Sequence, residues 1–455
     1  MSYYGNHNHT EDSNALLGFP DVLCKIPELI QTAYDLGLDG ITITEHEGIS
    51  SHIEALRYYD KMDKDRPFHL GLGNEIYLLE DWEDEENRNG EAKHPYYHFV
   101  LTALDTEGHH QLRQLSTRAW LRAYKQFIWR RPTYYSDLEE IIKPNQGHVI
   151  ASTACLGSRI DKLLLENEID KVDLEVERLV DIFGKDNLYI ECQPAKEKDT
   201  DQSKVNNVLW QTAEYHNLPI IPTTDTHYIK KEDAIYHKVY LQSQEGDREV
   251  DDFYATAYLM SPDELREHLR IDFTDEQIDQ MFEWSKELGE RIGEYNIRHD
   301  PIIPQAPLDK IPDFEIKHLF KDYYDAYENF GWYSNRNEIH ERLFFSQIEQ
   351  GLQNKIVKRG KPLEKYIARL NEEWTELRII SEQLSTSMPS YYSTMSFIID
   401  LIWDVGSLAM PARGSGAGFL TCYLLDITQI DPVPLGDYFP SWRHLNHLRG
   451  VELPD

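Results

Sequence analysis

Tyr3-Tyr-Gly-Asn-His-Asn-His-Thr10 is the stretch on which the interpretation of this chain depends. Its apolar start predicts a short strand that ends in His7 and His9. Side chains two positions apart on a strand point to the same side, so both imidazoles can face one point in space. Imidazole is a common ligand of zinc, manganese and iron. The pair therefore indicates part of a metal site, although a lone His-x-His also fits an ordinary surface strand.

Helical and strand-like segments alternate over residues 26–228. Apolar residues at three- and four-residue spacing predict helices at 25–36, 51–62, 171–183 and 203–216. Runs of β-branched and aromatic residues predict strands at 40–44, 68–72, 97–101, 148–152, 188–192 and 219–223. Such alternation favours parallel strands with covering helices, and about seven units predict a sheet that closes into a distorted (β/α)7-type barrel. Active sites of such barrels lie at the carboxyl ends of the strands.

Metal-binding side chains recur at the ends of these predicted strands. They are His46 after 40–44, Glu75 after 68–72, His98 at the start of 97–101, Cys155 after 148–152, and Asp225 and His227 after 219–223. Imidazole, carboxylate and thiolate groups are all donors for zinc- or manganese-type ions. Any one of them alone is more often structural. Together with His7 and His9 they predict one multinuclear metal site at a single end of the barrel.

The composition indicates in which cellular compartment the chain is expected. It has no apolar run of membrane-spanning length and no secretion signal, and its four cysteines form no CxxC pair. We therefore expect free thiols, no membrane association and a cytoplasmic location.

The formal net charge of −34 argues against a protein that binds nucleic acid through its overall charge. Bound divalent ions or a local basic patch can compensate. Residues 118–131 offer such a patch, with Arg118, Arg122, Lys125, Arg130 and Arg131 interleaved with aromatic residues. An amphipathic helix with a solvated basic side is the alternative.

The composition and the predicted secondary structure change after residue 298. Residues 299–312 are rich in proline and predict a seam between domains. Beyond it we expect helices at 314–330, 337–359 and 363–384. A glycine-rich loop at 410–418 then leads into an apolar helix at 419–425. A helix start with free N–H groups suits an anion, and Arg413 adds a fixed charge suited to phosphate.

These motifs resemble the PHP (polymerase and histidinol phosphatase) domain at the N-terminus of bacterial family C DNA polymerases, the DNA polymerase III α subunits. The matching stretches are HNHTEDS (7–13), ITITEH (41–46), LGNEIY (72–77), YYHFVLTA (96–103), IASTACLGS (150–158) and PTTDTHY (222–228). The resemblance implies nine metal ligands: His7, His9, Asp21, His46, Glu75, His98, Cys155, Asp225 and His227. Asp12 is an alternative to Asp21, and Glu45 stands where the family usually has aspartate.

The resemblance also implies an activity. It indicates three divalent ions, zinc, manganese or iron, and 3′–5′ exonuclease hydrolysis of DNA with Asp225 and His227 in catalytic positions. Clustered divalent ions lower the pKa of water and neutralise charge on a phosphodiester. The resemblance places these ligands in a PHP domain that we expect to cover residues 1–298.

Residues 313–455 resemble the start of the family's palm, a mainly helical part of a nucleotidyltransferase-type domain. There Arg413, Gly414 and Ser415 would hold the triphosphate of an incoming dNTP. Asp455 matches the first catalytic aspartate of a Pro-Asp-x-Asp motif that holds magnesium. Two-metal phosphoryl transfer needs at least two carboxylates. We therefore expect a split or truncated polymerase that needs a complementary C-terminal chain.

The expected partners are a DNA primer–template, dNTP and other replisome proteins such as a sliding clamp. Two alternatives remain at this point. One is a stand-alone PHP phosphoesterase that acts on a small phosphate ester. The other is a non-catalytic assembly module stabilised by its metals.

Overall fold

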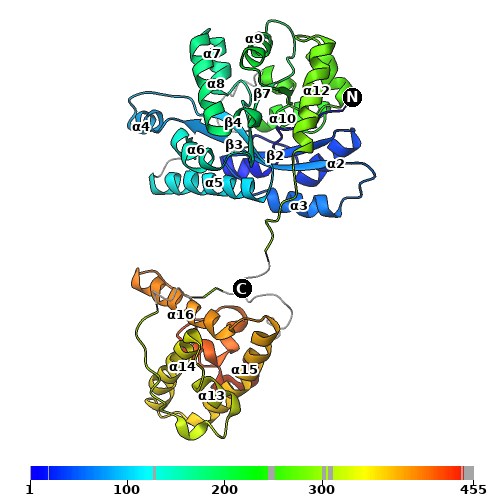
Figure 1. The fold of residues 1–455 in the computed structure, drawn as a ribbon. Coiled ribbons are helices and arrows are strands. Elements are labelled where there is room, and N and C mark those ends of the chain that lie inside the picture. Colours follow the sequence, from blue (N-terminus) through cyan, green and yellow to red (C-terminus); the bar gives the residue numbers. More distant parts are fainter. Residues whose placement is uncertain are drawn as a thin grey trace. The chain divides into compact units, whose positions relative to one another are not determined.

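The computed structural model describes residues 2–18, 20–126, 130–243, 252–299, 304–305, 311–441 and 444. The chain divides into two compact units, Met1–Arg298 and His299–Asp455. The first is a sheet surrounded by helices, and the second is mainly helical (Figure 1). Among the described residues, no helix combines the length and the apolar character that crossing a membrane requires.

The sheet of the first unit is barrel-like. Its strands follow the order β1-β2-β3-β4-β6-β7-β8, and β5 pairs with β3. The ends of the path meet where Asn8 forms a parallel bridge with Thr226. There the His9 N–H donates to the Thr226 carbonyl at 3.0 Å. The strands are β1 (Tyr4–Gly5), β2 (Gly40–His46), β3 (His69–Leu79), β4 (Tyr97–Ala103), β5 (Thr133–Tyr134), β6 (Val149–Ser152), β7 (Leu188–Cys192) and β8 (Ile220–Pro222). The predicted α/β barrel is confirmed.

The prediction that the strands are parallel is wrong at β4, which pairs antiparallel with both β3 and β6. The link from β3 to β4 contains α4 (Asp81–Asn89), whose buried residues include Glu83 and Asp84. A helix without an apolar stripe cannot pack across a sheet as a crossover helix does. The chain therefore turns back beside β3, which an antiparallel pair allows.

The other helices of this unit cover the sheet (Figure 1). One of them, α12 (Asp275–Glu290), contacts both β1 and β8 and so covers the seam between the first and last strands. Ser285 Oγ accepts the Tyr4 N–H at 3.2 Å, and a Cβ at Gly289 would lie 2.6 Å from the Tyr4 ring. The remaining helices are α1 (Asp12–Leu17), α2 (Ile26–Asp35), α3 (His52–Lys61), α5 (Thr106–Gln126), α6 (Tyr135–Ile141), α7 (Arg159–Leu165), α8 (Ile169–Phe183), α9 (Asp201–His216), α10 (Ala234–Leu241) and α11 (Pro262–Leu269).

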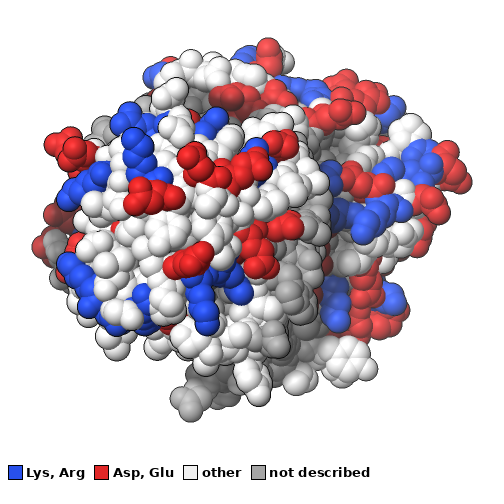
Figure 2. Space-filling model, turned by 90° about the horizontal axis from the view of Figure 1, so that it is seen from below, with Lys and Arg blue, Asp and Glu red and all other residues white. Residues whose placement is uncertain are grey.

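Ion pairs occupy much of the basic stretch predicted at 118–131. Arg118 pairs with Glu140 at 2.6 Å, Arg122 with Asp137 at 2.8 Å and Arg131 with Glu47 at 3.1 Å. Residues 127–129 lie outside the described residues. On the face that Figure 2 presents, acidic and basic side chains are likewise mixed. These arginines therefore do not form an unpaired basic patch. Arg131 also lies beyond the end of α5, so a helix with a solvated basic side does not describe the whole stretch either.

The second unit packs around Trp374, which is fully buried and stacks on Phe330 at 5.6 Å between ring centroids. Its helices are α13 (Glu328–Ser334), α14 (Ile339–Leu352), α15 (Leu363–Gln383), α16 (Met388–Asp404) and α17 (Leu420–Leu424). A π-helical turn, Gln353–Val357, continues α14.

The helix predicted at 314–330 is wrong for most of its length, because α13 begins only at Glu328. The buried Glu349 carboxylate accepts the backbone N–H groups of Lys317, His318 and Leu319 at 2.9, 3.2 and 2.8 Å. These donors are thereby satisfied without a helix, so the segment stays irregular.

Candidate metal centre

The end of β1 brings the first two histidines to one side. His7 and His9 are fully buried, and their Nε2 atoms lie 3.1 Å apart. Asn8, between them, turns the other way, and its Nδ2 donates to the carbonyls of Gly5 and Thr42 at 2.8 and 3.0 Å. The alternation of the extended chain thus positions both imidazoles.

The register of the sheet sets the next three donors. His46 at the end of β2 pairs with Glu75 of β3, and Tyr77 of β3 pairs with His98 of β4. Because β4 runs antiparallel to β3 and β6, its first residues lie at the same barrel end as the last residues of these two strands. This explains why His98 opens its strand. The His98 Nδ1 lies 2.8 Å from Glu75 Oε1 and 3.5 Å from the Cys155 sulfur.

The donors form overlapping groups that could each hold an ion. In three groups the ligand atoms lie within 4.8 Å of one another: His9, His46 and His227; His7, His9 and Glu75; and Glu75, His98 and Cys155. Asp225 Oδ1 adjoins them, 2.9 Å from His9 Nε2 and 3.3 Å from His7 Nε2. Side chains from β2, β3 and β4 and from the segments after β1, β6 and β8 therefore meet at one barrel end.

Of the two aspartates left open by the sequence, Asp21 lies at this cluster. Its side chain is buried, and its Oδ2 lies 3.4 Å from His46 Nε2 and 3.3 Å from His227 Nε2. Asp12 is only half-buried at the start of α1, where its carboxylate accepts the Ser50 hydroxyl at 3.3 Å.

The donor atoms fit a cation better than they fit one another. Both carboxylate oxygens of Glu75 and both ring nitrogens of His46 are buried without a hydrogen-bond partner among the described residues. Buried polar groups are normally hydrogen-bonded, because an unpaired one costs about 1–3 kcal/mol. Lone pairs that converge on a common space are what a divalent ion satisfies once the imidazoles have released their protons.

Burial and neighbouring charges shift the pKa values of this cluster in opposite directions. Burial and the nearby His46 lower the pKa of His9 to about 3. Burial also acts on His46, but Glu75 and Asp21 outweigh it and raise its pKa to about 10. Burial, with Asp225 and Glu75 nearby, raises the pKa of the Cys155 thiol well above its ordinary value. A thiolate at this position therefore needs a cation beside it.

Sequence reasoning missed Glu191, a fully enclosed carboxylate on β7. Its Oε1 lies 2.6 Å from His7 Nδ1 and accepts the Thr223 hydroxyl, and its Oε2 accepts the Ser152 hydroxyl at 2.7 Å. Carboxylates that hold the second nitrogen of a ligating histidine fix its ring orientation and tautomer. A charged residue inside the short apolar run 188–192 was the available signal.

Glu45 ties the loop after β1 to β2. Its buried carboxylate accepts the Thr10 N–H at 3.1 Å and the hydroxyl groups of Thr10 and Ser13. The Ser13 oxygen in turn accepts the His46 N–H at 3.2 Å. The residue beside His46 thus supports the loop instead of entering the cluster.

The predicted nucleotide-binding residues lie on a short 3-10 turn of the second unit. Gly414 has a positive φ of 60°, Arg413 is exposed, and Ser415 Oγ lies 3.0 Å from His444 Nδ1. The expectation that the following helix offers free N–H groups is wrong at Leu420 and Thr421. The Glu373 carboxylate accepts hydrogen bonds from these two N–H groups at 2.8 and 3.0 Å. Asp455 lies outside the described residues.

Comparison with known families covers both units. Residues 6–195 match the PHP domain, and residues 342–455 match the bacterial DNA polymerase III alpha NTPase domain. The chain is therefore similar to a PHP domain in its first unit and to the polymerase III alpha NTPase domain in its second. This confirms the resemblance drawn from the sequence motifs. PHP domains imply divalent metal ions, and the three donor groups are candidates to hold them.

Relatives match nearly the whole chain. The DNA-directed DNA polymerase of Bacillus phage SPbeta and the "Probable DNA polymerase YorL" of Bacillus subtilis strain 168 are each 38% identical over 99% of the chain. The DNA polymerase III subunit alpha of Thermus aquaticus is 26% identical over 99% of it. The chain spans 36%, 36% and 37% of these relatives, about a third of their length.

Proposed function

We propose that the PHP unit hydrolyses DNA phosphodiesters from the 3′ end with three divalent ions. The observation that carries this is the convergence of nine nitrogen, oxygen and sulfur donors, in which Glu75 and His46 have no hydrogen-bond partner among the described residues. The polymerase relatives support DNA, rather than a small ester, as the substrate.

The three donor groups supply the places for the ions. His9 belongs to two of them and Glu75 to two, so neighbouring sites share ligands. Bound divalent ions provide hydroxide near neutral pH and offset the charge of the phosphodiester. The protein's own part is to supply ionised carboxylates and to orient the imidazoles. Glu191 does this for His7 by fixing the proton on Nδ1, which leaves Nε2 facing the cluster.

We further propose that the second unit, beyond a seam at 299–312, is the first part of a polymerase palm that binds the triphosphate of a dNTP. The match to the NTPase domain supports this assignment. Since Glu373 occupies the start of α17, the phosphates are left with the Arg413 guanidinium and the N–H groups of the loop that contains Gly414 and Ser415. Magnesium binding at Asp455 and DNA polymerisation belong to this proposal.

The experiment is hydrolysis of a 5′-labelled DNA single strand by the purified chain in manganese or zinc. We expect stepwise shortening from the 3′ end, abolished in His9→Ala and Asp225→Ala. His94→Ala is the matched control, because this partly exposed histidine pairs with Glu86 away from the cluster. Shortening that persists in both variants would assign the activity to a contaminant. Cleavage of p-nitrophenyl phosphate alone would favour a small-ester phosphoesterase.

A further inference from the structure

A cavity of about 620 Å³ opens beside the metal-ligand cluster. Two of the proposed ligands, His98 and Cys155, form part of its lining, and both belong to the group that contains Glu75. Ligand pockets of proteins commonly enclose about 300–1,000 Å³. The space therefore suits a molecule of nucleotide size placed directly against the reacting centre.

The lining of this cavity has an apolar part and a cationic part. Leu156, Leu165 and Pro194 supply apolar surface. Lys162 of α7 and Lys196 of the connection between β7 and α9 both line the cavity and are exposed. A nucleotide has the same two characters, an apolar base and an anionic phosphate.

Tyr254 links the cavity to the cluster. It lines the cavity, its hydroxyl lies 3.4 Å from Asp21 Oδ1, and its ring centroid lies 5.3 Å from that of His227. Aromatic side chains are the usual platforms for unpaired bases, since every base has a face that can stack.

Acidic side chains also line this space, namely Asp199 and Asp201. Asp201 pairs with Lys204 at 2.8 Å, which offsets its charge. The two lysines are thus the cationic groups of the cavity in a chain whose net charge is −34. Asp199 also lines the cavity, so the lysines offer individual cationic contacts and not a uniformly positive wall. Local contacts of this kind let an acidic protein hold a phosphate backbone.

We propose that this cavity binds a nucleotide of the DNA single strand adjoining the bond to be cut, with Lys162 and Lys196 on its backbone phosphates. The inference rests on the proposed nuclease function and names the residues that select a polynucleotide over a small ester. It also accounts for substrate binding without the paired arginines of residues 118–131.

The test is binding of a 5′-fluorescein dT12 strand by anisotropy, in EDTA so that the strand stays intact. The double variant Lys162→Ala/Lys196→Ala should bind about tenfold more weakly at 0.1 M salt. The slope of log K against log salt should fall by about 1.4, because each phosphate contact on a single strand contributes about 0.7. Lys198→Ala, an exposed lysine of the same connection outside the lining, should change neither quantity.

Equal binding by the double variant and the native chain would overturn the inference, and so would an equal loss in Lys198→Ala. Hydrolysis in manganese separates this result from the nuclease proposal. If the native chain binds with the expected slope but never shortens the strand, the nuclease proposal fails and the binding site stands. If it shortens the strand and the double variant has the same KM, the binding site fails and the nuclease stands.

Discussion

The two units each bury a glutamate completely, and the surroundings of these carboxylates differ. Glu373 of the second unit accepts four hydrogen bonds, from Arg369 Nε, the N–H groups of Leu420 and Thr421, and the Thr421 hydroxyl, at 2.8 to 3.0 Å. Glu75 of the first unit is surrounded by imidazoles, and neither of its oxygens has a hydrogen-bond partner among the described residues.

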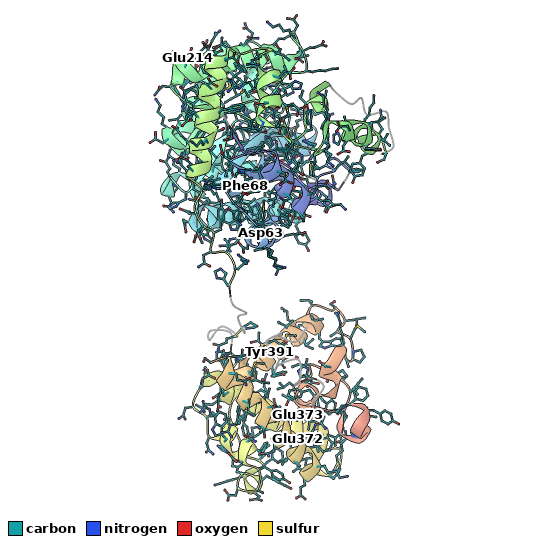
Figure 3. The ribbon with its side chains drawn as sticks, turned by 90° about the vertical axis from the view of Figure 1, so that its right-hand side faces the viewer. Asp63, Phe68, Glu214, Glu372, Glu373 and Tyr391 are labelled. Carbon is teal, nitrogen blue, oxygen red and sulfur yellow. The ribbon has the colours of Figure 1, made fainter. Side chains whose placement is uncertain are left out.

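This difference separates a structural carboxylate from a ligand. The chain's own donors satisfy Glu373, so its charge holds the start of α17 against α15, where Figure 3 labels it. The carboxylate of Glu75 faces imidazole nitrogens and a thiol, which together are a donor set suited to a divalent ion. Removing the two charges should therefore have opposite consequences for metal content and for stability.

The largest effect is expected at Glu75. Glu75→Gln should lower metal occupancy and reduce nuclease turnover by at least about 100-fold. Mutation of residues that only orient metal ligands already lowers metal affinity or activity by about 10- to 100-fold. Metal analysis and the strand-shortening assay measure both quantities. Glu85→Gln, an exposed neighbour on α4, serves as the control. Full metal content in Glu75→Gln would erase the contrast with Glu373.

At Glu373 the effect should be on stability. Glu373→Gln removes the charge that faces Arg369 and replaces one acceptor oxygen by an NH2 group that faces donors, which should cost about 3 kcal/mol of unfolding free energy. Urea unfolding followed by hydrogen exchange of the backbone N–H groups of α15 reports this unit. The adjacent, exposed Glu372→Gln should stay within about 0.5 kcal/mol. Metal content should be unchanged, and a loss of metal would contradict the division of roles.

A smaller effect is expected at Glu191, whose carboxylate contacts His7 Nδ1, the ring nitrogen away from the cluster. Glu191→Gln keeps the shape but weakens the hold on His7 Nδ1, and should reduce metal affinity about 10- to 100-fold. Competition with a chelator of known affinity measures it. Exposed Glu177→Gln on α8 is the control. Unchanged affinity would show that His7 is oriented by the strand alone.

The smallest effect on stability is expected at Arg413. This side chain is exposed, so Arg413→Ala should change unfolding free energy by less than about 0.5 kcal/mol. Binding of dATP with magnesium should weaken about tenfold, the value of one charged hydrogen bond. Arg359→Ala, exposed elsewhere in the unit, is the control. Equal dATP affinity in both variants would remove Arg413 from the nucleotide site.

The sequence predicted the barrel and the donors that lie at strand ends, because strand alternation is a local pattern. Asp21, between α1 and α2, was included only because of the family resemblance. It did not predict the reversal of β4, since direction depends on whether the connecting helix has an apolar face, and α4 has none. It also missed Glu191 and the Glu349 carboxylate that takes the N–H groups of residues 317–319. Both are contacts between residues distant in the chain, which no local pattern encodes.

The prediction for the helix after the glycine-rich loop was wrong for the same reason, a contact between residues distant in the chain. Its composition indicated free N–H groups at the next helix, but the acceptor comes from Glu373, 47 positions before Leu420. A cytoplasmic location and the need for a complementary chain stay predictions from the sequence.

Elemental analysis of the purified chain after reconstitution with manganese or zinc tests the central claim most directly. The account predicts three divalent ions per chain, with fewer in Glu75→Gln and the native number in Glu373→Gln. A native chain that binds no divalent ion, with the nine side chains intact, would contradict it.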